Sequence, residues 1–208
     1  MNKKGTLFII AAPSGAGKTS LVKALIADTP NIDVSISYTT RKPRQDEKDG
    51  EAYYFIDDEK FKKLINENFF LEYAKVFNHY YGTPRAWVEK EMETGRNFIL
   101  EIDWQGARQV SSQLRGCVSI FILPPDYHSL RDRLLNRQGD EPDTIDYRMQ
   151  AAKEEISHYK EYDFIIINDE FDRALAEIKA VITATNLGSC RQSAFYENFV
   201  GKIMAQND

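Results

Sequence analysis

Residues 6–19 read TLFIIAAPSGAGKT, and this stretch decides the fold. Its first half, Thr6–Ala12, is an unbroken apolar run, which is typical of a strand buried on both faces of a parallel sheet. The segment Ala12–Thr19 then fits seven of the eight positions of the pattern G-x-x-x-x-G-K-[ST], with Ala12 in place of the first glycine. An amphipathic pattern over Lys18–Ala27 follows. This succession of strand, loop and helix predicts a phosphate-binding loop at a helix N-terminus.

Each residue type in this loop has a physical task. Gly15 and Gly17 let backbone N–H groups come close to phosphate oxygens, and alanine at position 12 is tolerated where φ stays negative. We expect Lys18 to reach the β- and γ-phosphates of a nucleotide, and the Thr19 hydroxyl to bind Mg²⁺. The predicted ATP-binding residues of the loop are Ala12, Pro13, Ser14, Gly15, Ala16, Gly17, Lys18 and Thr19.

Apolar runs and helical patterns alternate along the rest of the chain. We expect further strands at Phe98–Ile102, Val118–Leu123 and Phe164–Ile167, and helices at Pro84–Glu93, Ala107–Leu114 and Thr144–Tyr159. The alternation predicts an α/β protein with a doubly wound parallel sheet of the phosphate-loop NTPase type.

Two stretches interrupt this alternation. Residues 35–83 hold short alternating pieces around a charged loop and predict an inserted lobe, while the charged residues 126–150, with a Gly and a Pro near their middle, predict a mobile lid. The remaining segments are assigned to the core, 1–34, 84–125 and 151–186, and to a C-terminal tail with one short helix, 187–208.

Composition narrows the function classes. The 208 residues carry a net charge of -5 and a pI of about 5.4, which argues against a nucleic-acid partner because such binding needs a basic face. The 2 cysteines are too few for a disulfide framework in a chain of this length. No apolar stretch approaches the ~20 residues of a membrane span, and the N-terminal apolar run is too short for a signal peptide. We therefore expect a cytoplasmic protein without a membrane partner.

Two acidic residues follow the expected strand at 98–102. Glu101 and Asp103 are two positions apart, so their side chains point to the same side at the carboxyl end of a parallel strand, where ligands bind. A carboxylate there suits Mg²⁺ held through water.

The segment Ser37–Arg44, SYTTRKPR, places two arginines in a hydroxyl-rich loop. A guanidinium group can donate two parallel hydrogen bonds to phosphate oxygens. Arg41 and Arg44 therefore suit a phosphate dianion, with the hydroxyl of Tyr53 beside it.

These segments together resemble the guanylate kinase family. The resemblance covers about residues 5–184 in the family's order and spacing, and it is carried by Ser37–Arg44 with Gly50–Phe55, Phe70–Ala74, Tyr80–Thr83, Glu101–Gly106, Ile120–Pro125 and Ile166–Asp169. It implies that ATP and GMP are the small-molecule partners, with Mg²⁺ as the cofactor.

The resemblance also implies residue roles. The GMP side would consist of Arg41, Arg44, Tyr53 and Tyr81 at the phosphate, Glu72 with Ser37 and Thr83 at the guanine, and Glu101 near the guanosine. Asp103 would lie near the metal and phosphates, Arg133, Arg137 and Arg148 of the lid would close over the transferring phosphate, and Asn168 would lie near the adenine. The residues expected to be catalytic are Lys18, Arg41, Asp103, Arg137 and Arg148.

Glu72 has a physical basis for reading guanine. Guanine presents two donors, N1–H and N2–H₂, on one edge, and a carboxylate accepts both, whereas adenine would leave it unpaired. The chain departs from the family's pattern in three places: Thr83 stands where serine is common, Glu101 where aspartate also occurs, and the lid reads Asn136–Asp140 where a glycine-flanked arginine is usual.

The sequence thus predicts in-line transfer of the ATP γ-phosphoryl group to GMP. Three alternatives remain: a non-catalytic module of the same family that binds phosphorylated protein segments, a kinase of another nucleotide or of a sugar phosphate, and an ATPase acting on nucleic acid. The retained Gly17 and Lys18 argue against the first, and Glu72 and the tyrosines argue for GMP. A homo-oligomer is compatible with the sequence.

Overall fold

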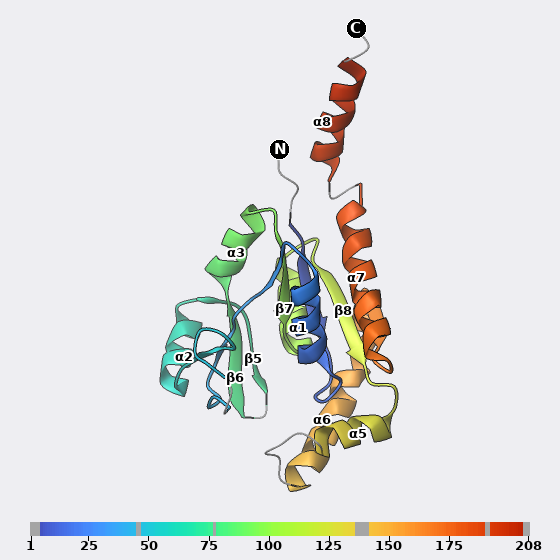
Figure 1. Cartoon of the computed structure of the whole chain (residues 1–208). Helices are drawn as coiled ribbons and strands as arrows, with labels where there is room; N and C mark the ends of the chain where they lie inside the picture. The colour runs from blue at the N-terminus through green and yellow to red at the C-terminus, as the bar shows by residue number, and fades with distance from the viewer. Residues whose placement is uncertain (1–4, 45–46, 77, 136–141, 190–191, 206–208) are drawn as a thin grey trace.

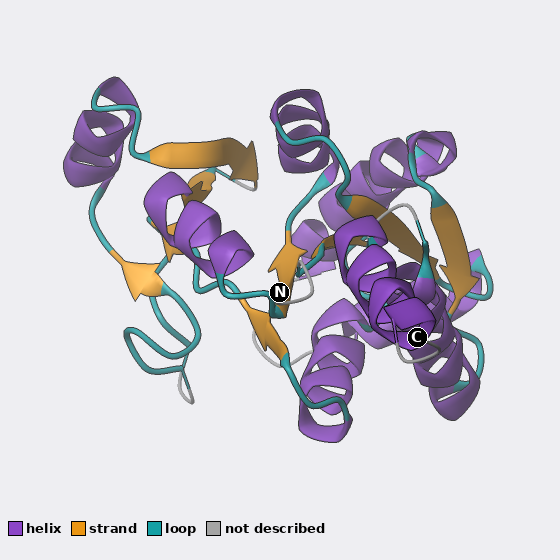
Figure 2. Ribbon diagram, turned by 90° about the horizontal axis from the view of Figure 1, so that it is seen from above, coloured by secondary structure: helices purple, strands orange, loops and turns teal. Residues whose placement is uncertain are grey.

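A computed structural model describes residues 5–44, 47–76, 78–135, 142–189 and 192–205. Within these residues the core is a five-stranded parallel sheet with helices on both faces (Figures 1 and 2). Its strand order is β2 (Ile32–Val34), β7 (Asn97–Glu101), β1 (Leu7–Ala11), β8 (Val118–Leu123) and β9 (Phe164–Ile167). The first strand lies at the centre between strands from distant parts of the chain, and the predicted doubly wound α/β core is confirmed.

The central strand is buried on both faces because its side chains alternate between two hydrophobic layers. Phe8 and Ile10 belong to the layer that α1 (Lys18–Asp28) and α7 (Phe171–Leu187) complete. Every residue of β1 is buried, as the continuous apolar run predicts.

The opposite layer contains Leu7 and Ile9 with residues of α3 (Arg85–Glu93) and α4 (Trp104–Gln113). The expected start of the first of these helices was one residue early, because Pro84 ends a strand in extended conformation and precedes the helix. This helix stops before Gly95, whose φ of 78° is the left-handed conformation expected at a helix end.

The strand β9 departs from the prediction of burial on both faces. It lies at the edge of the sheet, and Phe164, Ile165 and Ile167 keep 40%, 40% and 49% of their surface exposed. A strand at the edge of a sheet can thus have the same apolar composition as a central strand. The sequence of a strand does not indicate whether it has one neighbouring strand or two.

The described part of the chain between β2 and α3 forms a second sheet of four strands, which lies beside the core (Figure 1). Its order is β4 (Tyr54–Phe55), β3 (Tyr38–Thr39), β6 (His79–Pro84) and β5 (Phe70–Val76). The helix α2 (Asp58–Asn66) begins where the Asp57 carboxylate accepts from Lys60 N–H, and it buries Phe61 against Phe70 with ring centroids 4.5 Å apart.

Two further helices, α5 (Tyr127–Leu135) and α6 (Pro142–Ser157), pack against each other at the end of the molecule toward which β8 points (Figure 1). They share a small hydrophobic cluster of their own, formed by Leu130, Leu134, Ile145, Met149 and Ala152. A single 3-10 turn, η1 (Tyr159–Glu161), then leads into the edge strand.

The C-terminal helix α8 (Ser193–Met204) extends from the far end of the molecule, away from α5 and α6 (Figure 1). It provides the short helix expected in the tail. None of the described helices combines the length and apolar character needed to cross a membrane.

Candidate functional site

The phosphate loop joins β1 to α1 with two glycines in the left-handed region. Gly15 has φ 90° and Gly17 has φ 93°, and the second of these precedes the first helical residue. A Cβ at position 17 would also lie 2.5 Å from Asn168 Nδ2, so a side chain is excluded there by both conformation and space. The loop therefore presents the N-terminus of α1, as phosphate binding requires.

Two residues expected at the ATP side brace this loop from behind. Asn168 is buried, and its Nδ2 donates to the Ala16 carbonyl over 2.7 Å. Arg133 donates from Nη1 to the same carbonyl over 3.4 Å and from Nη2 to the Asn168 carbonyl over 3.0 Å. In this geometry both side chains fix the loop backbone, and the role of Asn168 at the adenine stays a prediction.

Lys18 and Asp103 lie at the carboxyl ends of the central strands. Lys18 Nζ donates to the Ile102 carbonyl over 3.4 Å. Asp103 is the N-cap of α4, where its Oδ1 accepts from Gly106 N–H over 2.9 Å and its Oδ2 from Gln105 Nε2 over 3.1 Å. This cap fixes the carboxylate at the edge of the sheet where the strands end, and it leaves lone pairs on the carboxylate for further hydrogen-bond donors.

A carboxylate that sequence reasoning missed lies on the same loop. Glu155 Oε2 of α6 accepts from the Ser14 N–H over 3.0 Å. Burial raises the pKa of Glu155 to about 7, although the Ser14 hydrogen bond and the nearby Lys18 lower it. Its position seven residues after Arg148 was the available signal, since two turns of helix bring both to one face.

Arg41 and Arg44, which were expected at the acceptor phosphate, are held by Glu47, a residue that was also missed. Arg41 donates from Nη1 and Nη2 to the two carboxylate oxygens over 2.8 and 2.9 Å, and Arg44 N–H donates to Oε2 over 2.8 Å. Burial opposes ionisation of Glu47, but these hydrogen bonds outweigh it and hold its pKa below the usual value. The Arg41 guanidinium lies 5.4 Å from the Tyr53 ring centroid, and that ring packs edge-on against Tyr81. The arginine side chains and the two tyrosine rings, Tyr53 and Tyr81, therefore lie close together in one group.

Glu72 points inward from β5 and is 3% exposed. Its Oε1 accepts from Thr83 Oγ1 over 2.5 Å, and the Ser37 hydroxyl lies 3.5 Å from the same Thr83 oxygen. Burial raises the pKa of Glu72 to about 7 against the effect of the Thr83 hydrogen bond. A Cβ at Gly106 would lie 2.5 Å from Glu72 Oε2, so that glycine makes the room for the carboxylate.

Glu101 and Tyr53 both line the cleft, and each has a shifted pKa. Burial raises the pKa of Glu101, opposed by Lys18 and Lys23. Burial, together with the charge of Glu101, raises the pKa of Tyr53 to about 12, which keeps its hydroxyl a hydrogen-bond donor at neutral pH.

All these features open into one cleft of about 1490 Å³. Among the predicted site residues, those that line it are Ala12, Pro13, Ser14, Gly15, Gly17, Lys18, Thr19, Ser37, Arg41, Arg44, Tyr53, Glu72, Tyr81, Glu101, Asp103, Arg133, Arg148 and Asn168. Ala16 and Thr83 are buried behind the lining, where they accept from Asn168 and donate to Glu72. Arg137 lies outside the described residues. Within the described part, no three His, Cys, Asp or Glu side chains are grouped to hold a metal ion.

Comparison with known proteins points to one family. The sequence model described as guanylate kinase matches residues 4–185. A guanylate kinase from Alkalilimnicola ehrlichii is 52% identical over 180 residues, which cover 86% of this chain and 89% of that protein. One from Vibrio cholerae is 49% identical over 205 residues, 98% of this chain and 99% of its own. The crystal structure of guanylate kinase from Anaplasma phagocytophilum matches with a TM-score of 0.76 at 33% identity, covering 92% and 91% of the two chains.

Proposed function

Because this chain belongs to the guanylate kinase family, we propose that it transfers the γ-phosphoryl group of ATP to GMP and releases ADP and GDP. The observation that carries the proposal is that one cleft is lined by the phosphate loop, by arginine and tyrosine side chains and by the buried carboxylate of Glu72. Phosphoryl transfer depends on positioning two anions and stabilising their charge, which such a cleft provides.

On the ATP side, the phosphates bind the loop amides at the start of α1, and Lys18 neutralises the β- and γ-oxygens. The Thr19 hydroxyl and, partly through water, the Asp103 carboxylate would hold Mg²⁺. The residues fit this ion, because Mg²⁺ keeps several waters and needs only one or two protein ligands plus phosphate. When bound there, Mg²⁺ would supply positive charge that offsets the charge of the phosphates.

On the acceptor side, Arg41 and Arg44 bind the GMP phosphate, and the hydroxyls of Tyr53 and Tyr81 donate to its remaining oxygens. Glu72 accepts from guanine N1–H and N2–H₂. The Thr83 hydroxyl fixes the direction of that carboxylate over 2.5 Å, with Ser37 beside it and Glu101 near the guanosine.

The GMP phosphate is already ionised near neutral pH, so the attack on the γ-phosphorus needs no general base. Arg133 of α5 and Arg148 of α6 would close over the transferring group, with Arg137 in the same role, and α5 and α6 would act as a lid that excludes water. We further propose that the protein works in the cytoplasm and needs no nucleic acid or membrane. A homo-oligomer is compatible with this activity.

The deciding experiment measures ADP formation by the purified protein with ATP and Mg²⁺, offering GMP, dGMP, AMP, CMP and UMP in turn. We expect GMP-dependent turnover that the Lys18→Ala variant lacks, which also controls for contaminating kinases. Turnover that prefers another acceptor would reassign the substrate. No turnover from folded protein with any acceptor would favour the non-catalytic module that binds phosphorylated protein segments.

A further inference from the structure

Glu155 is connected to the phosphate loop by a contact that spans 141 positions of sequence. Its Oε2 accepts from the Ser14 N–H over 3.0 Å, and the side chain lines the substrate cleft. Ser14 lies in the loop between the end of β1 and the start of α1, so this carboxylate holds the loop backbone itself. Asn168 and Arg133 brace the loop only at the Ala16 carbonyl.

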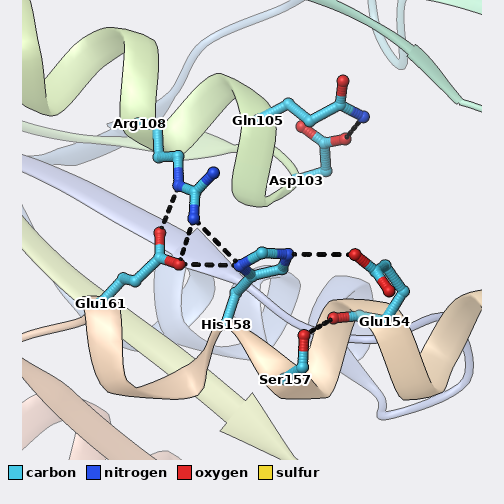
Figure 3. A network of polar contacts seen from close by, with 7 residues as sticks. All are labelled: Asp103, Gln105, Arg108, Glu154, Ser157, His158 and Glu161. Atoms are coloured by element: carbon cyan, nitrogen blue, oxygen red, sulfur yellow. Dashed lines mark hydrogen bonds and ion pairs between the residues drawn. The ribbon is translucent and has the colours of Figure 1, made fainter.

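The helix that carries Glu155 is itself anchored one turn further on (Figure 3). His158 stacks on the Trp104 ring with centroids 3.9 Å apart, and its Nδ1 lies 2.7 Å from Glu161 Oε1. Arg108 donates from Nε and Nη2 to the same carboxylate over 2.6 and 2.5 Å. The segment directly after α6 is therefore held against α4, three residues beyond Glu155.

Two residues on the same face of α6 line the cleft. Arg148 and Glu155 are seven positions apart, two helical turns, and both line the cleft. One helix thus carries both Arg148, expected in the lid, and the carboxylate that accepts from the phosphate loop.

We propose that Glu155 is a positioning residue that fixes the conformation of the phosphate loop through its hydrogen bond to Ser14 N–H. It acts on ATP through the loop and does not touch the reacting atoms. The inference rests on the proposed binding of ATP phosphates at this loop.

The geometry assigns this role to the acceptor oxygen and not to the negative charge. A negative charge beside Lys18 weakens the attraction of that ammonium for phosphates, so charge alone would oppose ATP binding. Burial raises the pKa of Glu155 to about 7, so the charge is already reduced near neutral pH. A side chain of the same length with a neutral acceptor should therefore work.

Three variants separate reach from charge. Glu155→Gln keeps the length and an acceptor but removes the charge, Glu155→Asp keeps the charge but is one methylene too short, and Glu155→Ala removes both. We expect kcat/KM for ATP to fall about tenfold in the Asp and Ala variants, the size of one lost buried hydrogen bond. It should stay within about threefold of the wild type in the Gln variant, and KM for GMP should change less than about twofold in all three.

Glu154→Gln is the matched control, since Glu154 is the preceding residue, its side chain is 69% exposed, and its 3.6 Å contact with His158 is of a kind worth little at the surface. If the Ala variant fails to fold, as judged by its melting temperature, the comparison of Asp with Gln still decides. Normal activity in Asp with loss in Gln would show that charge matters and overturn the proposal, as would equal activity of all variants. Wild-type protein without GMP-dependent turnover would instead refute the proposed function, and direct ATP binding to the same variants would then test Glu155 by itself.

Discussion

Replacing Glu72 by glutamine tests how the protein selects its acceptor. The carboxylate is 3% exposed and is held by Thr83 over 2.5 Å. Glutamine has nearly the same shape, and its oxygen can still accept from Thr83. Its amide nitrogen, however, places a donor where guanine also offers donors. The variant thus changes the hydrogen-bond pattern without opening a cavity.

The expected loss follows from the bonds that change. A hydrogen bond to a charged group contributes about 1.5–3 kcal/mol, and Glu72 offers guanine two of them. In the glutamine variant one becomes a neutral bond and the other becomes a donor facing a donor. We expect GMP affinity to fall by about 3–4 kcal/mol, or about 10²–10³ in Kd, with ATP affinity changed less than about twofold.

The pKa of Glu72 near 7 adds a pH signature. Guanine donors favour the ionised carboxylate, so GMP binding should strengthen as pH rises through about 7. The ionised fraction rises from about one-tenth at pH 6 to about nine-tenths at pH 8, a change of about tenfold in affinity. The phosphate of GMP titrates in the same range, but it does so equally with either protein. The ratio of the two Kd values isolates Glu72.

Calorimetric titration of GMP and, separately, of ATP at pH 6, 7 and 8 measures both effects. The wild-type advantage over Glu72→Gln for GMP should increase about tenfold from pH 6 to pH 8. A constant advantage would show that Glu72 does not titrate in this range. Equal weakening of GMP and ATP would refute the assignment of Glu72 to the guanine.

Three further substitutions test the rest of the cleft. Lys18→Ala should lower kcat by about 10²–10³, because one preorganised cation leaves the transferring phosphate, and a near-normal kcat in the presence of GMP would remove it from the mechanism. Gly106→Ala should raise KM for GMP about tenfold by displacing Glu72, while the melting temperature is kept by the better helix propensity of alanine; an unchanged KM would mean that the carboxylate can retreat. Glu47→Ala should raise KM for GMP about fivefold because the acceptor-side arginines lose their anchor, whereas Glu51→Ala, with a side chain 70% exposed on the same loop, should not; matching effects would point to the loop as a whole.

Local patterns predicted the four core strands β1, β7, β8 and β9, because each is an apolar run. The bounds expected for β8 and β9, Val118–Leu123 and Phe164–Ile167, are those observed. The strand Ile32–Val34 was not predicted, since three residues with an aspartate in the middle show no periodicity. The helix Asp58–Asn66 was expected only as part of a mixed lobe, although its Asp57 cap was readable.

The supporting contacts of the candidate site could not be predicted in the same way. Glu155 with Ser14, and Gly106 with Glu72, are pairs that a local window never holds together. Periodicity indicates that a side chain is buried but does not indicate which group it meets. The resemblance to a family predicted which residues bind the ligands. The residues that hold those side chains in place were identified only from the three-dimensional structure.

The charge of the cleft shows why this difference matters for function. Among the described residues that line it, seven are lysine or arginine and seven are aspartate or glutamate, so composition alone indicates a neutral cleft, poorly suited to two anionic substrates. Burial changes that balance, because it raises the pKa values of Glu72 and Glu155 to about 7 and so reduces their charge near neutral pH. Glu47 stays ionised, but its charge is neutralised by the ion pair with Arg41. The remaining excess of positive charge lies in the cleft, and it arises from where the carboxylates are buried, not from how many there are.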